Sequence, residues 1–280
     1  MADVQETLAE ALDLGEEGRW DEMSQLLTVA LREAPDDPFV LCWLGVAERE
    51  LGRDGVAYEY FKRCWREDPL DPHILAICGA GLAAFDDVDA EAALRAAVLT
   101  GPEVAIARLH YGAFLARGGV FDQALEHLNA AVALEPDDPT MHGELGIAHA
   151  LKGDSAGAAA AMERALEIAP DDSWTRVLLG LIYLQLGQLE ECAEQLLQAA
   201  DERAEDAEAQ ILAALAACAA GWEDAAYTTL ARADFANEGS DNELVEEARE
   251  QIEEGADAAR EYLEEEAAPY ALRDRMIQPL

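Results

Sequence analysis

Apolar residues recur three and four positions apart along most of the 280-residue chain. Segment 139–172 shows this pattern most clearly, because one apolar stripe ends at Gly153 and a second ends at Pro170. Its apolar positions are Met141, Leu145, Ile147, Ala148, Leu151, Ala158, Ala161, Met162, Ala165, Leu166 and Ile168. Such spacing places side chains on one face of an α-helix, whereas a strand would alternate them. The segment is therefore predicted to form two short helices, each about 20 Å long at 1.5 Å per residue.

Prolines and glycines that end the apolar stripes recur along the chain at a nearly constant spacing. Successive prolines are 34, 33, 34 and 34 residues apart, and glycines follow the same period. The prolines are Pro35, Pro69, Pro102, Pro136 and Pro170, and the glycines are Gly18, Gly52, Gly119, Gly153, Gly187 and Gly221. A constant period of this length indicates a solenoid, in which each repeat packs only on its neighbours.

Aspartate and proline mark where each pair of helices begins. In segment 136–139, Pro-Asp-Asp-Pro, an aspartate can cap the next helix, and proline suits the first turn, where its missing N–H costs nothing. Residues 35–38 repeat this sequence, and residues 69–72 and 170–173 vary it. A helix is predicted to begin after each of them.

Residues at fixed places in the repeat resemble those of the tetratricopeptide repeat family. That family has a large residue, Leu-Gly and a bulky residue on the first helix, small-bulky-small on the second helix, and a closing proline. The matching positions are Trp43, Leu44, Gly45, Ala57, Phe61 and Pro69; Tyr111, Gly112, Phe121, Ala124, Leu128, Ala131 and Pro136; and Leu179, Gly180, Tyr183, Cys192, Leu196 and Ala199. The resemblance implies an all-α, right-handed α-solenoid of about seven helical hairpins over residues 4–240. Its units are expected at 4–37, 38–71, 72–104, 105–138, 139–172, 173–206 and 207–240.

The third unit and the C-terminal region depart from the pattern. Asp86 and Asp87 stand where the sibling units have glycine, so the turn of that hairpin is predicted to be rebuilt. Residues 241–268 are predicted to form one acidic capping helix that covers the apolar end of the last repeat. Residues 269–280 are expected to be a C-terminal tail. Its apolar residues are Tyr270, Leu272, Met276, Ile277 and Leu280, and its basic residues are Arg273 and Arg275.

The charge is strongly acidic, with 59 Asp and Glu against 19 Lys and Arg, a net of −40. The acid is spread along the chain, and lysine occurs only twice, which favours adaptation to a high-salt host, where screening is strong. A basic client protein held by the acidic surface is the alternative. Nucleic-acid binding is disfavoured, because phosphates require basic patches.

No catalytic motif, metal-ligand spacing or phosphate-binding loop is present, so we expect no enzyme activity, no cofactor and no metal. His142 and His149 are seven residues apart and are interpreted as interior side chains rather than ligands. The five cysteines are interpreted as buried thiols. They are Cys42, Cys64, Cys78, Cys192 and Cys218. No membrane span and no export signal are apparent, and the cytoplasm is the expected compartment.

In the family that the chain resembles, the first helix of each unit lines a concave groove. At the groove-facing places of units four to seven, the residues are almost all apolar, whereas an ordinary surface helix has a polar face. The predicted partner-binding residues are Ile106, Leu109, Ile147, Trp174, Val177, Leu181, Leu184, Ile211 and Leu215, with Trp174 as the anchor. Two alternatives remain. Either neighbouring repeats bury these residues, or the groove holds a partner segment.

The resulting functional hypothesis is a non-enzymatic scaffold or adaptor that holds a partner protein or peptide in an apolar concave groove. The C-terminal tail is a candidate ligand for the groove of its own chain or of a neighbour. An accessory or assembly subunit that acts as a rigid spacer in an enzyme or secretion complex is the alternative.

Overall fold

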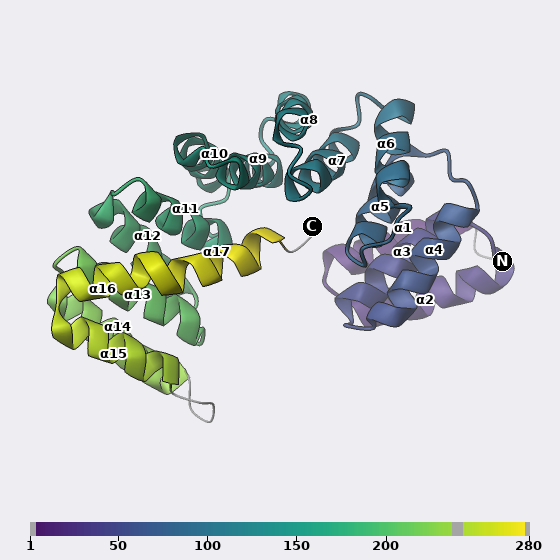
Figure 1. Cartoon of the computed structure of the whole chain (residues 1–280). Coiled ribbons are helices and arrows are strands. Elements are labelled where there is room, and N and C mark those ends of the chain that lie inside the picture. The colour runs from purple at the N-terminus through teal and green to yellow at the C-terminus, as the bar shows by residue number, and fades with distance from the viewer. Residues whose placement is uncertain (1–3, 237–242, 278–280) are drawn as a thin grey trace. The chain divides into compact units, whose positions relative to one another are not determined.

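The computed structural model describes residues 4–236 and 243–277, and every regular element in those ranges is helical (Figure 1). Within the described chain, residues 4–135 form one compact unit and residues 136–277 form a second. The all-α architecture of repeated helical hairpins confirms the predicted fold class.

The described part of the first unit consists of four hairpins, in which consecutive helices pack against each other. They are α1 (Val4–Glu16) with α2 (Trp20–Glu33), α3 (Pro38–Glu50) with α4 (Asp54–Arg66), α5 (Pro72–Ala83) with α6 (Ala90–Thr100), and α7 (Ala105–Arg117) with α8 (Phe121–Leu134).

The described part of the second unit has three such hairpins, followed by a C-terminal helical region. The hairpins are α9 (Pro139–Lys152) with α10 (Ser155–Ile168), α11 (Ser173–Gln185) with α12 (Leu189–Glu202), and α13 (Ala207–Ala219) with α14 (Glu223–Ala236). The C-terminal region comprises α15 (Glu243–Glu254), α16 (Ala256–Tyr262), the π-helical turn η1 (Leu263–Ala267) and α17 (Ala268–Ile277).

The predicted helix starts are confirmed by their caps. Asp138 accepts a hydrogen bond from the backbone N–H of Thr140 at 2.8 Å, and Pro139 stands in the first turn of α9. The same capping role belongs to Asp37, Asp71, Asp172 and Asp206. Each cap satisfies backbone donors that the first turn of a helix leaves unpaired.

Glycine is required at two kinds of place. The turn glycine Gly153 has a φ of +84°, in the left-handed region that other residues rarely adopt, and its counterparts in five other hairpins also have positive φ. Inside the first helices, a Cβ atom added to Gly146 would lie 2.7 Å from Cγ of Met162, and one added to Gly180 would lie 2.8 Å from Cγ of Leu196. In these hairpins the two helices therefore approach so closely that only glycine fits between them, whereas the first and seventh hairpins have Ala11 and Ala214 at this place.

The third hairpin has a rebuilt turn, as its sequence predicts. Asp86 adopts a φ of +52°, and the Asp87 carboxylate receives hydrogen bonds from Lys62 Nζ at 2.7 Å and from the Tyr58 hydroxyl at 2.8 Å. The Asp87 side chain is only 6% exposed. Burial would raise the pKa of Asp87, but the hydrogen bonds from Lys62, the Asp89 N–H and Tyr58 outweigh it, so the net pKa is lowered.

A side chain at the fourth place of four successive repeats reaches back to the preceding backbone. Arg108 Nε donates to the carbonyl of Pro102 at 2.6 Å, and His142 Nε2 donates to that of Pro136 at 2.9 Å. Arg176 makes the same bond to Pro170. In the seventh hairpin Gln210 instead donates to the carbonyls of Ala200 and Arg203. Each of these bonds ties a residue in the first turn of a hairpin to the backbone of the segment just before it.

The predicted single capping helix over residues 241–268 is wrong. Gly255 interrupts it with a φ of +117°, so α15 and α16 are separate helices that pack against each other. The expected tail is also helical as far as Ile277, because α17 continues from η1. Leu280 and the side chains of Arg273, Arg275 and Ile277 lie outside the described residues.

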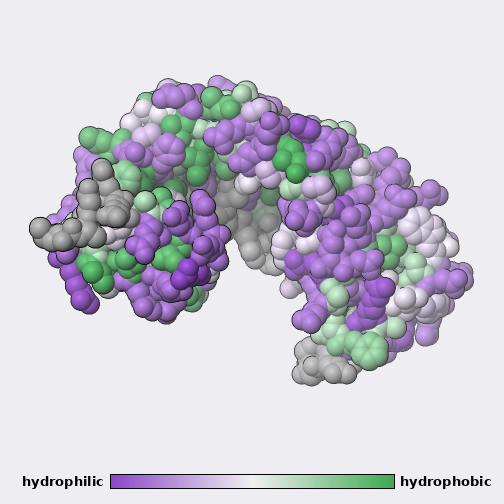
Figure 2. Space-filling view, turned by 180° about the vertical axis from the view of Figure 1, so that it is seen from behind, coloured by the Kyte–Doolittle hydropathy of each residue, from purple (hydrophilic) through white to green (hydrophobic). Residues whose placement is uncertain are grey.

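Small apolar side chains fill the space between helices, while charged side chains cover the outside. In the second unit one buried cluster runs from Ile147 through the repeats to Met276 of α17. Figure 2 shows one face of the molecule, on which hydrophilic residues predominate and hydrophobic residues form small separate groups.

Candidate interaction surface

The nine predicted groove residues all lie on the first helices of hairpins, but they fall in both units. Ile106 and Leu109 are on α7 of the first unit. The second unit carries Ile147 on α9; Trp174, Val177, Leu181 and Leu184 on α11; and Ile211 and Leu215 on α13.

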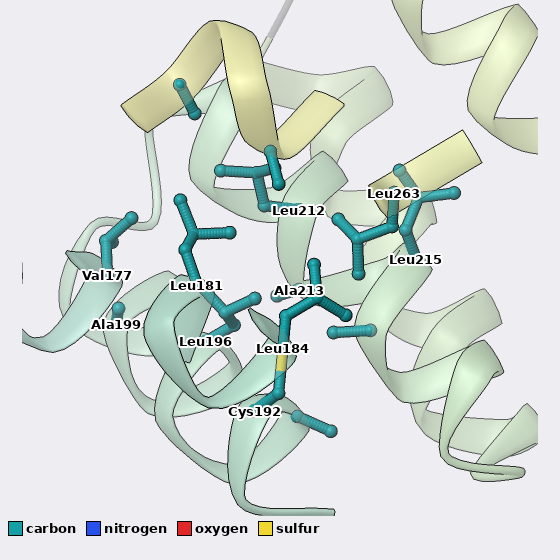
Figure 3. Packing of buried hydrophobic residues seen from close by; sticks show 14 of the residues in the cluster. Val177, Leu181, Leu184, Cys192, Leu196, Ala199, Leu212, Ala213, Leu215 and Leu263 are labelled. Carbon is teal, nitrogen blue, oxygen red and sulfur yellow. The ribbon is translucent and has the colours of Figure 1, made fainter. Parts of the chain in front are cut away.

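Most of these side chains are buried within their own unit. Val177, Leu181 and Leu215 have no exposed surface, and Leu184 is 4% exposed. Leu109, Ile147 and Ile211 are also buried, whereas Ile106 is half-buried. Residues 175–182 and Leu184 of α11 are all buried, whereas Trp174 at its start is not. In Figure 3, Val177, Leu181 and Leu184 lie among side chains of α12 and α13, such as Leu196 and Leu212.

The chain's own C-terminal region covers part of this face. Helix α16 and η1 pack on α13, and α17 packs on α11. Leu263 of η1 lies beside Leu215 of α13 in Figure 3, and both belong to the cluster that contains Leu272 and Met276 of α17. In the free chain, α16 to α17 thus lie where a ligand of the predicted groove would lie on α11 and α13.

A cleft of about 460 Å³ remains beside this contact. Leu184 and Gln185 of α11 line one side of it, and Ala268, Pro269 and Leu272 of α17 line the other. The junction between α11 and α17 is therefore incompletely packed along one edge.

Trp174, the predicted anchor, behaves differently from the other residues. It is 47% exposed at the start of α11, and the guanidinium carbon of Arg203 lies 3.7 Å from the ring centroid. Arg203 also pairs with Asp206 at 2.9 Å. One face of the indole thus makes a cation–π contact, and the exposed part of the ring is open to solvent.

The groups with potential chemistry are held in structural roles. All five cysteines are buried, and burial raises the pKa of Cys192 to about 12, so that its thiol stays protonated. His149 Nδ1 lies 2.9 Å from Asp154, beside the turn of its hairpin. Burial, with Arg49 and Arg117 nearby, lowers the pKa of His110 to about 4, so this side chain is neutral at pH 7.

Two further observations concern bound groups and membranes. The described residues contain no group of three or more His, Cys, Asp or Glu side chains arranged to hold a metal ion. None of the described helices is both long enough and apolar enough to cross a membrane.

The sequence suggested the C-terminal tail as a candidate ligand of the groove, but it did not identify α16 and η1 as neighbours of α13. The apolar residues Ala259 and Leu263 were visible, but their spacing suits a cap over the end of the last repeat equally well. The apolar character of Leu272 and Met276 was the available signal, since it distinguishes this segment from an acidic solvated terminus.

Comparison with known proteins agrees with the repeat geometry. Models of the tetratricopeptide repeat match residues 89–139, 113–173 and 149–218. No curated protein matches the chain.

Several solved structures are similar to the chain in fold. The APC/C hetero-tetramer Cut9–Hcn1 gives a TM-score of 0.69 at 19% identity, covering 88% of this chain and 49% of the other, so our chain spans about half of that protein. The human IFIT1 dimer with PPP-AAAA gives 0.67 at 15% identity, covering 96% and 73%. Pseudomonas aeruginosa pilF gives 0.60 at 16% identity, covering 76% and 96%.

Stacked hairpins with glycine contacts and a 34-residue period define a helical repeat protein. Residues 89–218 match the tetratricopeptide repeat family, and the chain is a tetratricopeptide repeat protein in this sense. Proteins of this family and fold are typically non-catalytic, and its repeats support a protein-interaction scaffold in general.

Proposed function

We propose that the protein is a non-catalytic scaffold that holds a partner polypeptide against the first helices of its hairpins. The observation that supports this most is the seating of a helical segment, α16 to α17, on the apolar faces of α13 and α11. A face that packs against a helix of its own chain has the shape and apolar character that a partner helix requires.

Trp174 is the residue through which we propose to test this function. A partly exposed tryptophan on the first helix is the residue type that most often dominates an interface when it is covered. Leu181 is unsuitable, because it is fully buried and an aspartate there would disrupt the unit itself.

The test compares two alanine substitutions of similar exposure. Trp174→Ala on α11 is expected to reduce the amount of partner recovered from the native host, at its own salt concentration, by about tenfold or more, which corresponds to about 1.4 kcal/mol or more. Tyr227→Ala on the second helix α14 is the control, because Tyr227 is 48% exposed against 47% for Trp174. Equal recovery with both variants, each with unchanged helicity, would contradict the proposal.

The burial of seven of the nine predicted groove residues favours the second candidate function. An accessory subunit that acts as a rigid spacer needs closed inner faces rather than an open groove. Such a spacer should copurify stoichiometrically with one complex, whereas a scaffold for clients should release and exchange them. The same purification from the host, followed by quantification of each bound protein, separates the two.

A further inference from the structure

The C-terminal segment contains a built-in change of helix geometry. Residues 263–267 form a π-helical turn, in which the Ala268 N–H bonds to the carbonyl of Leu263, five residues back. Pro269 explains this turn, because it has no N–H to donate to the carbonyl four residues earlier and its ring would clash with that carbonyl. Widening the turn removes the clash, and such single π-turns are frequent at functional positions.

The parts on either side of this turn are attached unequally. On the N-terminal side, Ala259 and Leu263 are completely buried in the cluster that includes α13, and the Tyr262 hydroxyl bonds to Glu247 of α15 at 2.8 Å. On the C-terminal side, α17 packs on α11 beside the 460 Å³ cleft, which Arg260 of α16 and Glu264 of η1 also line, and Leu272 keeps 9% of its surface exposed. A helix of ten residues is only marginally stable without its packing partner. The structure therefore places the weaker attachment at α17.

Charge also distinguishes the last segment. Residues 269–280 contain two arginines and one aspartate, a net charge of +1, in a chain whose total is −40. Helix α17, which packs on α11, contains both of these arginines, whereas the rest of the protein is strongly acidic. A basic partner helix is attracted by the acidic protein in the same way as α17 is. This attraction raises its association rate and disfavours acidic competitors.

We propose that α17 is a displaceable internal ligand, and that the face of α11 beneath it receives an amphipathic helix of a partner protein. The buried residues of α17 and its sequence define that partner: small side chains at the places of Ala268 and Ala271, Leu- or Met-sized side chains at those of Leu272 and Met276, and a net basic charge. This inference rests on the proposed scaffold function and specifies its ligand. Helix α16 stays in place, and the π-turn with Pro269 is the hinge.

The probe for this inference is a fluorescein-labelled peptide of residues 266–280, titrated into the full-length chain by fluorescence anisotropy. A tethered segment competes at an effective concentration of about 1 mM, so a peptide with an intrinsic Kd of about 10 µM would bind the wild-type chain roughly 100-fold more weakly than an open one. Leu272→Glu places a charge in the contact of α17 and should improve peptide binding by at least about tenfold. Tyr270→Glu makes the same charge change on the exposed side of α17, where Tyr270 is 67% exposed, and should bind as the wild type does.

Hydrogen exchange of the same full-length proteins supplies the second measurement. In the wild type, amides of residues 268–277 should exchange faster than those of α16 and α13, and in Leu272→Glu the α11 and α13 amides should keep their protection. If α17 is protected as strongly as α13, or if the wild type and Leu272→Glu bind the peptide equally, the proposal is wrong. If Leu272→Glu lowers the protection of the α11 amides, the Met276→Glu variant is used in its place. The exchange of the wild-type α17 amides tests the proposal without either variant.

Light scattering separates an internal ligand from an exchange between copies. The wild type should remain monomeric at the concentrations of the titration, and a dimer that Leu272→Glu dissociates would overturn the internal arrangement in favour of a second copy. Because the peptide assay contains no host protein, its failure leaves the Trp174→Ala recovery experiment intact. Failure of that recovery experiment likewise leaves the displacement result standing.

Discussion

At the scale of single residues, the hydrogen bonds from the fourth place of each repeat share a function without sharing a residue type. Arg108, His142 and Arg176 donate to the carbonyl of a proline six residues earlier. Gln210 serves the seventh hairpin, which has no closing proline, by bonding to the last turn of α12. What these side chains have in common is an N–H donor that reaches a backbone acceptor left over at the end of a helix.

Some contacts of single residues can be predicted from the sequence, but these hydrogen bonds cannot. The aspartate caps could be predicted, because a cap and its helix are adjacent in the chain and the geometry is local. The donors at the fourth place could not be recognised, because an arginine, a histidine and a glutamine show no common pattern until the path of the backbone is known.

The buried carboxylate of the third hairpin provides a prediction about stability. Asp87→Asn should lower the free energy of unfolding of the first unit by about 2 kcal/mol at pH 7, since it weakens hydrogen bonds between charged groups at a nearly buried site. Asp86→Asn is the control, because it removes the same charge from the neighbouring exposed position and asparagine tolerates a positive φ. Urea unfolding followed by tryptophan fluorescence measures both, and equal effects of the two variants would contradict this role of Asp87.

The difference in unfolding free energy between the wild type and Asp87→Asn should depend on pH. Because the pKa of Asp87 is lowered in the folded state, its contribution is fully present above the unfolded pKa of about 3.9 and is lost as pH falls through the folded pKa. The difference between the wild type and Asp87→Asn should therefore be constant from pH 7 to pH 5 and shrink below pH 4. A difference that persists unchanged under acid conditions would mean that the carboxylate charge is not responsible.

At the scale of elements, one glycine sets the separation of the two helices in each of the second to sixth hairpins. Glycine in a helix lowers stability by up to about 1 kcal/mol relative to alanine, so its presence requires a compensating gain. At Gly45 the gain is contact with Phe61, because an added Cβ would lie 2.6 Å from that ring. The resemblance to the family predicted this contact correctly, since it fixed which glycines face the second helix.

Two glycines of α9 allow that explanation to be tested within one helix. Gly146→Ala should destabilise the second unit by about 1 kcal/mol or more, because overpacking against Met162 outweighs the gain in helix propensity. Gly143→Ala should stabilise it by about 0.5–1 kcal/mol, because the added Cβ meets only Thr175 Oγ1 at 3.9 Å. The sign of each change in urea unfolding is the measurement, and the same sign for both would contradict the packing argument.

The C-terminal elements show why helix boundaries were harder to predict than helix existence. The apolar stripe of residues 241–268 continues in register through Gly255, so periodicity alone gives one helix. Residues 269–280 were expected to be a tail, yet the π-turn before Pro269 lets the chain remain helical into α17. In both cases the backbone conformation of one residue decided the outcome.

At the scale of the whole molecule, the net charge of −40 is distributed along both units. We interpret the dispersal as adaptation to high salt, and a basic client remains the alternative. At low ionic strength the like charges repel one another, whereas at 1 M salt the Debye length falls to about 3 Å and the repulsion is screened.

Salt titration tests this interpretation. The urea midpoint at pH 7 should rise between 0.1 M and 2 M NaCl, because screening relieves repulsion that opposes the compact state. Repeating the titration at pH 4.1, close to the sequence pI, is the control, since the net charge there is near zero and most of the rise should disappear. An equal rise at both pH values would show that the salt acts through hydration rather than through charge.

The apolar inner faces could be predicted as a whole, and the C-terminal tail was one candidate occupant, but the packing of α16 and η1 on α13 could not be predicted. Groove positions follow from the period once the family is recognised, and the structure places all nine residues on first helices. Hydrophobicity indicates that Val177, Leu181 and Leu215 are covered, but the covering group depends on where distant residues fold. For α11 and α13, that group includes a segment about 50 to 90 residues further along the chain.

The hydrogen bonds at the fourth place have a consequence for how such proteins change in length during evolution. If a deletion removed residues 139–172, Asp138 would stand directly before Ser173, and Arg176 would follow Pro136 by six residues. The new junction would then have the same cap and the same donor–acceptor pair as each original junction. Gene rearrangements that remove one complete repeat therefore keep the cap and the donor–acceptor spacing where the ends meet, whereas a deletion that joins two repeats out of register would lose both.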